Sequence, residues 1–305
     1  MTRAKGSGGR GLNRTALILL AVLSLIWGSS FILIKKGLEG FTAPQAGSLR
    51  ILLAALVMLP VAWKRRRSLP MGSLKWIVLF GLLEVGLPPY LYTWAQTGIS
   101  SGTAGVLNSL VPLFTLLVGW FFFGQSLGTA RVLGVLLGLG GALVLMGWPR
   151  EGSRTPWLGL LIVLATLLYA LAGNILQRHL RDVPGLTIAA FAFVLMVPLA
   201  LPVMLLAPGR GGLVGGAQQI QSLVALVLLA WLGSALAIHL FSLLIQAAGA
   251  LLASFVTYFI PFVALLWGIL DGEPLSWPAI LALGLILLGV VLVNRSHGPV
   301  REGPG

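Results

Sequence analysis

The stretch LLEVGLPPY, residues 82–90, places a carboxyl group close to two prolines inside a long apolar run. Glu84 lies about ten residues into that run, roughly 15 Å along a helix. Proline has no N–H, so Pro88 frees the carbonyl group of Glu84, and Pro89 frees that of Val85. A carboxylate beside free carbonyl groups could bind an ammonium group or a proton. The alternative is a structural acid, protonated or paired with Arg50.

Arg50 is a second ionisable side chain placed well inside an apolar run. It lies about seven residues into its run, roughly 10 Å deep, where it could reach Glu84. A guanidinium group can hold a carboxylate through two parallel hydrogen bonds, which predicts a contact with an acidic substrate group. Structural pairing with Glu84, or with carbonyl groups at a helix end, is the competing interpretation.

Three further polar side chains interrupt apolar runs: Asn108 in VLNSLVP, Asn174 and His239. The two amides could line a cavity, or could form hydrogen bonds between helices, which contribute about 0.6 kcal/mol in membranes. His239 could carry a proton near neutral pH. Its alternative role is that of a hydrogen-bonded core residue, since no H-x-x-H or acid–histidine spacing predicts a metal site.

Aromatic residues recur in the same segments as these polar groups. Trp27, Tyr169 and Tyr258 fall away from the ends of their apolar runs, so anchoring at a membrane surface does not explain them. Aromatic walls of this kind could line a pocket for apolar or aromatic metabolites, with ordinary packing as the alternative for each residue. The set comprises Trp27, Tyr92, Trp94, Tyr169 and Tyr258.

Composition defines the environment of these residues. The chain has 305 residues, of which 58% are hydrophobic and 9% charged, with a mean hydropathy of +1.00. Soluble domains carry about 25% charged residues, so the surface must face lipid. The net charge of +13 comes from short basic clusters between apolar runs, such as KRRR at 64–67, a pattern of membrane topology and not of a nucleic-acid-binding face. Without cysteine the chain has no disulfide or thiol chemistry, and no metal or other cofactor is expected.

Ten apolar segments are long enough to cross a bilayer, which needs about 20 residues each. The first run, 15–34, resembles a signal peptide but is too long and lacks an A-x-A cleavage site, so we interpret it as a retained span. The sequence therefore predicts an all-α polytopic membrane protein. The predicted spans are 15–36, 43–63, 74–96, 102–123, 129–148, 156–179, 185–207, 222–245, 250–270 and 277–294.

The distribution of lysine and arginine predicts the orientation. With the N-terminus in the cytoplasm, fourteen of these residues fall on the cytoplasmic side and five on the other, while Arg50 lies within a span. The positive-inside rule then predicts that both termini are cytoplasmic, in the inner (plasma) membrane. The five outer residues are Lys35, Lys36, Arg150, Arg154 and Arg210.

The two halves of the chain resemble each other. Aligning Pro112 with Pro261 matches several neighbours, and with a shift of one residue GQSL at 124–127 meets GEPL at 272–275. At the front of each half, WGSSFILIKK at 27–36 lies against YALAGNILQR at 169–178. Five spans in each half make the repeat inverted, an arrangement typical of transporters. The expected organisation is a cytoplasmic tail at 1–14, a first repeat at 15–148, a linker at 149–155, a second repeat at 156–294 and a cytoplasmic tail at 295–305.

These segments are similar to the EamA-type family of the drug/metabolite transporter superfamily. The resemblance rests on WGSSFILIKKG at 27–37, on Pro44 and Arg50, on the run from 90 to 145, and on its weaker copy at 254–293. It implies a ten-helix bundle with a central cavity and export of amino acids or related metabolites. The second half departs in one respect: the position equivalent to Arg50 is Ala192. The span paired with 74–96 is 222–245, which has neither acid nor proline, so the Glu84 site is expected to be one-sided.

The leading hypothesis is a secondary transporter, not an enzyme, that exports small metabolites such as amino acids or amines by alternating access. A membrane-embedded enzyme and a lipid or lipid-linked sugar translocase are the alternatives. Gly134 and Gly138 form G-x-x-x-G, which predicts close helix packing or a homodimer contact. Glu84 and Arg50 are the expected proton-coupling or ion-pair residues, and Pro88, Pro89, Pro112 and Pro261 the expected hinges. The expected substrate contacts are Trp27, Glu84, Trp94, Asn108, Tyr169, Asn174, His239 and Tyr258.

Overall fold

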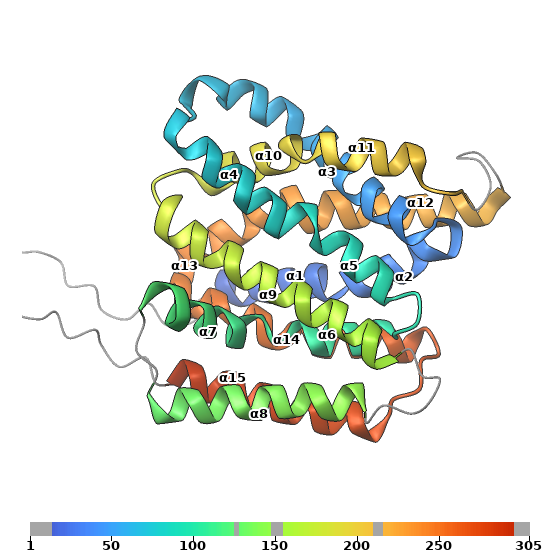
Figure 1. The fold of residues 1–305 in the computed structure, drawn as a ribbon, viewed down its shortest axis with the longest axis vertical. Coiled ribbons are helices and arrows are strands. Elements are labelled where there is room, and N and C mark those ends of the chain that lie inside the picture. The colour runs from blue at the N-terminus through green and yellow to red at the C-terminus, as the bar shows by residue number, and fades with distance from the viewer. Residues whose placement is uncertain (1–13, 125–127, 148–154, 210–215, 296–305) are drawn as a thin grey trace, which may run out of the picture.

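The computed structural model describes residues 14–124, 128–147, 155–209 and 216–295. Within these ranges every regular element is helical, and the long helices run roughly parallel or antiparallel to one another (Figure 1). The helices of the first half are α1 (Arg14–Gly28), α2 (Ser30–Gly40), α3 (Ala43–Arg65), α4 (Leu74–Gly81), a π-helical turn η3 (Leu82–Gly86), α5 (Pro88–Ala95), α6 (Ser101–Asn108), α7 (Val111–Phe123) and α8 (Thr129–Met146).

The second half follows a similar order of helices. They are α9 (Thr155–His179), α10 (Gly185–Leu195), α11 (Val197–Leu206), α12 (Gly216–Ala230), a second π-helical turn η4 (Trp231–Leu236), α13 (Ala237–Ser254), α14 (Val256–Leu270) and α15 (Trp277–Arg295). Prolines explain several interruptions within apolar runs. A helix tolerates proline in its first turn, but the same proline ends the helix that precedes it. Pro112 stands in the first turn of α7, whereas Pro261 lies inside α14.

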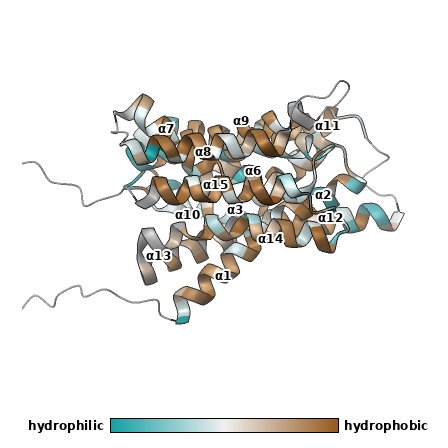
Figure 2. Ribbon diagram, turned by 90° about the horizontal axis from the view of Figure 1, so that it is seen from below, coloured by the Kyte–Doolittle hydropathy of each residue, from teal (hydrophilic) through white to brown (hydrophobic). Residues whose placement is uncertain are grey.

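Among the described residues, eight helical stretches are long and apolar enough to cross a membrane, and two shorter apolar helices accompany them, at Val256–Leu270 and Trp277–Val293. The chain is therefore a multi-pass membrane protein. Figure 2 shows hydrophobic residues along the shafts of the helices and hydrophilic ones towards their ends. The eight stretches are Arg14–Gly40, Ala43–Arg65, Met71–Ala95, Ser101–Phe122, Thr129–Met146, Trp157–His179, Gly185–Leu206 and Gly216–Gly233.

The structure differs from the expected spans at one boundary. The sequence predicts a break at 246–249, between spans 222–245 and 250–270, but α13 continues through these residues to Ser254. The corresponding connection in the first half, 96–100, is a turn. Residues 246–254 are QAAGALLAS, rich in the strong helix formers Ala and Leu, whereas 96–102 is QTGISSG. Local propensity accounts for the continuous helix.

Helices from the two halves pack against each other in matched pairs. The first span of each half contacts the fourth span of the other: α1 packs on α14, and α9 packs on α6 and α7. The contact of α2 with α12 corresponds in the same way to that of α9 with α5. Three further pairs join equivalent helices of the two halves: α3 with α10, α6 with α14 and α8 with α15. The contacts between the halves are thus approximately two-fold symmetric.

The α8–α15 pair lies along one edge of the bundle (Figure 1). A Cβ atom on Gly134 would lie 2.5 Å from the carbonyl oxygen of Gly289, and one on Gly138 would collide with Leu113. Both glycines are buried within the chain. The G-x-x-x-G motif therefore permits close packing inside this bundle.

Candidate functional site

The predicted span 74–96 is broken where the acid and the prolines stand. Helix α4 ends at Gly81, the π-helical turn η3 carries Glu84, and α5 begins at Pro88. π-Helical turns inside α-helices are frequent at functional sites because they widen the backbone locally. Glu84 is thus positioned by an irregular turn between two short helices.

Backbone hydrogen bonds show why this turn has free acceptors. The amide of Leu87 donates to the carbonyl group of Leu82, five residues earlier. The next two available amides, those of Tyr90 and Leu91, both donate to the carbonyl group of Leu87. Pro88 and Pro89 supply no amide hydrogen. The carbonyl groups of Glu84 and Val85 therefore lack the donors that an α-helix would give them, next to the Glu84 carboxyl group.

Arg50 and Tyr169 approach this turn from other helices. The guanidinium group of Arg50, on α3, lies close enough to interact with the Glu84 carboxyl group and with the Tyr169 hydroxyl group, on α9. No salt bridge within 4.0 Å joins Arg50 to Glu84 in the described part of the chain. All three side chains remain partly accessible. The two charges are near each other without being locked into a pair, which leaves both able to contact a third group.

Tyr92 and Asn108 extend this group along α5 and α6. Tyr92 is 2% exposed and donates its hydroxyl hydrogen to Oδ1 of Asn108, 2.6 Å away. Its ring stacks against that of Tyr169, with centroids 6.0 Å apart, and lies 5.9 Å from that of Phe31. We refer to Arg50, Glu84, Tyr92, Asn108 and Tyr169 as the interior polar cluster, which draws on both halves of the chain.

Trp27 occupies an equivalent place at the other π-helical turn. Its Nε1 donates to the carbonyl oxygen of Gly233 in η4 at 3.3 Å, and its ring lies 5.3 Å from that of Phe241. At the spacing that aligns Pro112 with Pro261, Glu84 aligns with Gly233. Tyr169 approaches η3 and Trp27 approaches η4, so each π-helical turn meets an aromatic residue from the opposite half.

Other predicted contacts lie outside the interior polar cluster. Asn174 is 4% exposed and donates to the carbonyl oxygens of Ala170 and Thr115, at 2.9 and 3.1 Å. Tyr258 points towards the carbonyl group of Val290 on α15, at 3.4 Å. His239 lies on α13, but its side chain falls outside the described residues. Hydrogen bonding thus gives Asn174 and Tyr258 an evident role in joining helices.

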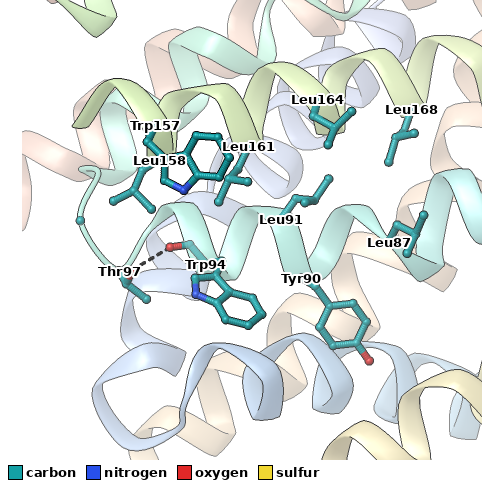
Figure 3. A pocket seen from close by; sticks show the side chains of 11 residues that line it. Leu87, Tyr90, Leu91, Trp94, Thr97, Trp157, Leu158, Leu161, Leu164 and Leu168 are labelled. Carbon is teal, nitrogen blue, oxygen red and sulfur yellow. Dashed lines mark hydrogen bonds between the residues drawn. The ribbon is translucent and has the colours of Figure 1, made fainter. Parts of the chain in front are cut away.

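Trp94 faces away from the cluster and is 53% exposed. It lines an apolar groove between α5 and α9 with a volume of about 960 Å³. Figure 3 shows Leu87 and Leu91 on one wall and Leu164 and Leu168 on the other, with Trp157 towards one end. The groove is a feature of the side of the bundle and starts near the break in span 74–96.

Four charged residues at one end of the bundle form a group that the residue-by-residue survey of the sequence missed. Lys35 lies 2.8 Å from Asp271 and 2.7 Å from Glu273, and Lys36 lies 2.7 Å from Asp271. We call Lys35, Lys36, Asp271 and Glu273 the ion-pair cluster. The predicted topology puts residues 35–36 and 271–273 on the same side of the membrane. Their contact could have been suggested by that shared side. Among the described residues no group of three or more His, Cys, Asp or Glu side chains could hold a metal ion.

Comparison with known proteins places this geometry in context. Residues 14–147 and 156–295 each match the model of the EamA-like transporter family. The uncharacterized inner membrane transporter YedA of Escherichia coli K12 is 30% identical over 278 residues, 90% of this chain and 89% of that protein. A crystal structure with 20% sequence identity superposes with a TM-score of 0.61 over 92% of this chain and 96% of that one, so the fold is shared.

Two relatives carry names that mention substrates. A probable amino-acid metabolite efflux pump of Escherichia coli K12 is 25% identical over 172 residues, 56% of each chain. A probable terminal-alkyne amino-acid exporter of Streptantibioticus cattleyicolor is 28% identical over 202 residues, 62% of this chain and 64% of that protein. Amino-acid-derived compounds are therefore named for two similar proteins.

Proposed function

Because the chain belongs to the EamA-like transporter family, we propose that it is a secondary transporter that exports amino acids or related amines by alternating access. The observation that carries this proposal is the interior polar cluster. It combines a carboxyl group, a guanidinium group, an amide and aromatic rings from both halves of the chain, beside an interrupted helix. Groups of both charges are what a zwitterionic substrate requires.

The fold part of the proposal is a bundle of ten spans built from two inverted five-span repeats, 15–148 and 156–294. Two separate matches to one family model support it, as do the approximately symmetric contacts between the halves. With five spans in each half, the second repeat enters the membrane from the opposite side. Exchange of conformation between the two halves would then alternate access to a site that lies between them.

Each member of the interior polar cluster has a proposed role in binding. The Glu84 carboxylate and the carbonyl groups freed by the two prolines bind the ammonium group of the substrate. Arg50 binds the substrate carboxylate, for which a guanidinium group provides two parallel donors. Tyr92 and Tyr169 form an aromatic wall, with Asn108 fixed by the Tyr92 hydroxyl group. Trp27 closes the opposite wall against η4.

Glu84 is also the proposed point of coupling to protons. It is the acid nearest the middle of a span, and intramembrane acids that face a protein interior commonly serve as proton carriers. Proton and substrate would compete for the same carboxyl group. Pro88, Pro89, Pro112 and Pro261 are the proposed bending points, with the first three at the beginning of helices.

The proposed location is the inner membrane, with both termini in the cytoplasm. The excess of lysine and arginine on that side supports this orientation. It would place the ion-pair cluster at the outer end of the bundle and Asp182, between α9 and α10, at the inner end.

The direct test is uptake of radiolabelled amino acids and amines into proteoliposomes, after a thermal-shift screen to choose substrates. A bound ligand raises the unfolding temperature by mass action, so the screen identifies binders before any transport assay. We expect binding of at least one zwitterion or amine, loss of that binding in Arg50→Ala, and resistance to a toxic amino-acid analogue in cells overproducing the protein. Absence of binding across the whole panel would refute the proposed substrate class.

A lipid or lipid-linked sugar translocase is the second candidate, favoured by the groove between α5 and α9. A translocase needs a site that opens sideways to lipid, and this groove is apolar and adjoins the break at Leu87. Reconstitution with fluorescent phospholipids or lipid-linked sugars separates the candidates, because only a translocase would accelerate their movement between leaflets.

A further inference from the structure

The turn after α14 has a geometry that fixes the position of two acidic side chains. The amide of Gly272 donates to the carbonyl oxygen of Ile269 at 3.0 Å, and that of Glu273 donates to Gly268 at 2.8 Å. This is the Schellman arrangement, and Gly272 has the positive φ of 79° that it requires. The turn carries Asp271 and Glu273 at the C-terminal end of α14.

The Glu273 carboxylate is held at the N-terminus of α6, a helix of the other half. Its oxygens accept hydrogen bonds from Nζ of Lys35 (2.7 Å), the amide of Ser101 (2.9 Å), the Ser101 hydroxyl group (3.0 Å) and the amide of Gly102 (3.1 Å). The side chain is 9% exposed. The first amides of a helix have no internal partner and favour an anion, so this carboxylate caps α6.

The charge of Glu273 is stabilised by these donors. Burial opposes ionisation, yet the hydrogen bonds from Lys35, Ser101 and Gly102 together hold the pKa of Glu273 below its usual range. Hydrogen bonds from Lys35 and Lys36 likewise lower the pKa of Asp271. Both acids are therefore charged at neutral pH and bound to cations of α2.

The close approach of the two halves at this point depends on two glycines. A Cβ atom on Gly268 would lie 2.5 Å from Oε2 of Glu273, and one on Gly102 would lie 2.9 Å from Leu265. Only glycine leaves room for the carboxylate between α14 and α6. The contacts are thus specific to the present arrangement of the two halves and would be lost if α6 and α14 separated at this end.

We propose that Glu273, bound to Lys35 and to the N-terminus of α6, is the gate that holds this end of the transporter closed. Every bond that it makes outside its own turn crosses from the second half of the chain to the first. A charged side chain with four donors on the partner half stabilises the closed state relative to one in which the halves have moved apart. Glu273 is a positioning residue: it sets the populations of the two states and contacts no substrate.

This inference rests on the alternating-access part of the proposed function, and its test does not require transport. The chain has no cysteine, so a single cysteine can report access to the interior. Asn108→Cys provides it, about 10 Å further along α6 than Ser101. The measurement is the rate of reaction with a charged, membrane-impermeant methanethiosulfonate, applied separately to right-side-out and to inverted vesicles.

In Glu273→Gln we expect the reaction from the side of the 271–276 turn to accelerate about tenfold, because charged hydrogen bonds specific to the closed state are lost. From the opposite side it should slow, because the two openings exclude each other. The matched control is Asp182→Asn, which removes an exposed carboxyl group at the other end of the bundle and should change neither rate.

Unchanged rates on both sides in a monodisperse Glu273→Gln protein would overturn the gate. If that variant does not fold, Lys35→Gln decides by the same measurement, because it leaves the cap on α6 in place. Exchanging the charges, Lys35→Glu with Glu273→Lys, should leave the gate open, since a cation cannot cap α6. Restoration of the parental rates by this exchange would instead indicate a simple surface ion pair. Altered labelling, together with no transport of any solute by the parental protein, would refute the proposed function and leave the gate standing.

Discussion

The two π-helical turns, η3 in the first half and η4 in the second, occupy equivalent places but differ in chemistry. Each lies in the third span of its half, and each meets an aromatic residue from the other half, Tyr169 at η3 and Trp27 at η4. Glu84 stands in η3 where Gly233 stands in η4, and only η3 is followed by prolines. A π-helical turn can therefore form at this place in the fold without a following proline.

This difference distinguishes backbone features that both halves share from chemical groups that occur in one half alone. The widened turn recurs in both halves and belongs to the shared backbone. The carboxyl group, the freed carbonyl groups and Arg50, whose equivalent is Ala192, occur in one half alone. An approximately symmetric backbone can thus carry an asymmetric site.

Replacing Glu84 with glutamine should reduce proton-driven net transport by about a hundredfold, because the carboxyl group proposed to bind both substrate and proton is removed. Exchange of substrate for substrate, which moves no net proton, should persist. The measurement is uptake into proteoliposomes with and without a pH gradient.

The matched control for Glu84 is the equivalent position in η4. Among the described residues, the nearest neighbour of a Cβ atom on Gly233 would be Ser30 Oγ at 3.8 Å, so Gly233→Ala meets no close contact there. We expect this variant to keep transport within about threefold of the parent, an effect below 1 kcal/mol. Equal losses of transport in Glu84→Gln and Gly233→Ala would show that the two turns are functionally alike.

The double change Pro88→Ala and Pro89→Ala makes η3 resemble η4. It should lower transport about tenfold, because two backbone amides become available as hydrogen-bond donors. The new amides can hydrogen-bond the carbonyl groups of Glu84 and Val85, which are proposed to bind the substrate. Because proline at the start of a helix contributes little to stability, the unfolding temperature should change by only a few degrees. A parallel fall in transport and stability would point to a structural role for the prolines.

Tyr92→Phe should destabilise the protein by about 1 kcal/mol, because the Asn108 amide loses the donor at 2.6 Å in a buried setting. Tyr258→Phe is the comparison variant, because its hydroxyl group contacts Val290 at 3.4 Å and lies away from the cluster. Thermal unfolding in detergent measures both. Similar changes in unfolding temperature for the two variants would show that the hydrogen bond of Tyr92 contributes no more to stability than the contact of Tyr258.

The smallest effect concerns the turns that end α7 and α14. Gly124 and Gly272 both have positive φ, but the next residue is Gln125 in one and Glu273 in the other. Because the pKa of Glu273 and that of Asp271 lie below their ordinary values of 4.5 and 3.8, ionisation stabilises the folded state above those values. That contribution is lost as pH falls below about 4.5 towards the lowered values in the folded protein.

The unfolding temperature should therefore fall below pH 4.5, and less so in Glu273→Gln, which resembles the first half at this position. Asp182→Asn should retain the full decline. An identical pH profile in Glu273→Gln and the parent would show that the carboxylate contributes no pH-dependent stability.

Most helices could be predicted from sequence, and the exception is instructive. The apolar runs predict the spans of the first half and α9, α10, α11 and α15, because the cost of burying polar backbone in lipid acts on each segment separately. The break expected at 246–249 is absent because that expectation relied on span length, while Ala and Leu favour continued helix.

The candidate site was predictable in part. Depth within a span identified Glu84 and Arg50, and their approach follows from packing of α3 on α5, the helix that follows η3. Tyr92 and Trp94 were equal candidates by composition, yet they stand two residues apart on α5, about 200° around the helix. Only one of them could face the interior, and it is Tyr92.

By itself the sequence determined the class of protein, the helical segments, the single acid deep in a span and the loss of hydrogen bonds at Pro88 and Pro89. These are local properties, fixed by hydropathy and by covalent structure. The tertiary structure decided which faces of the helices meet, and so joined Tyr92 to Asn108 and Lys35 to Asp271 and Glu273 across the two halves. Such pairings depend on the rotation and register of packed helices, which no single segment specifies.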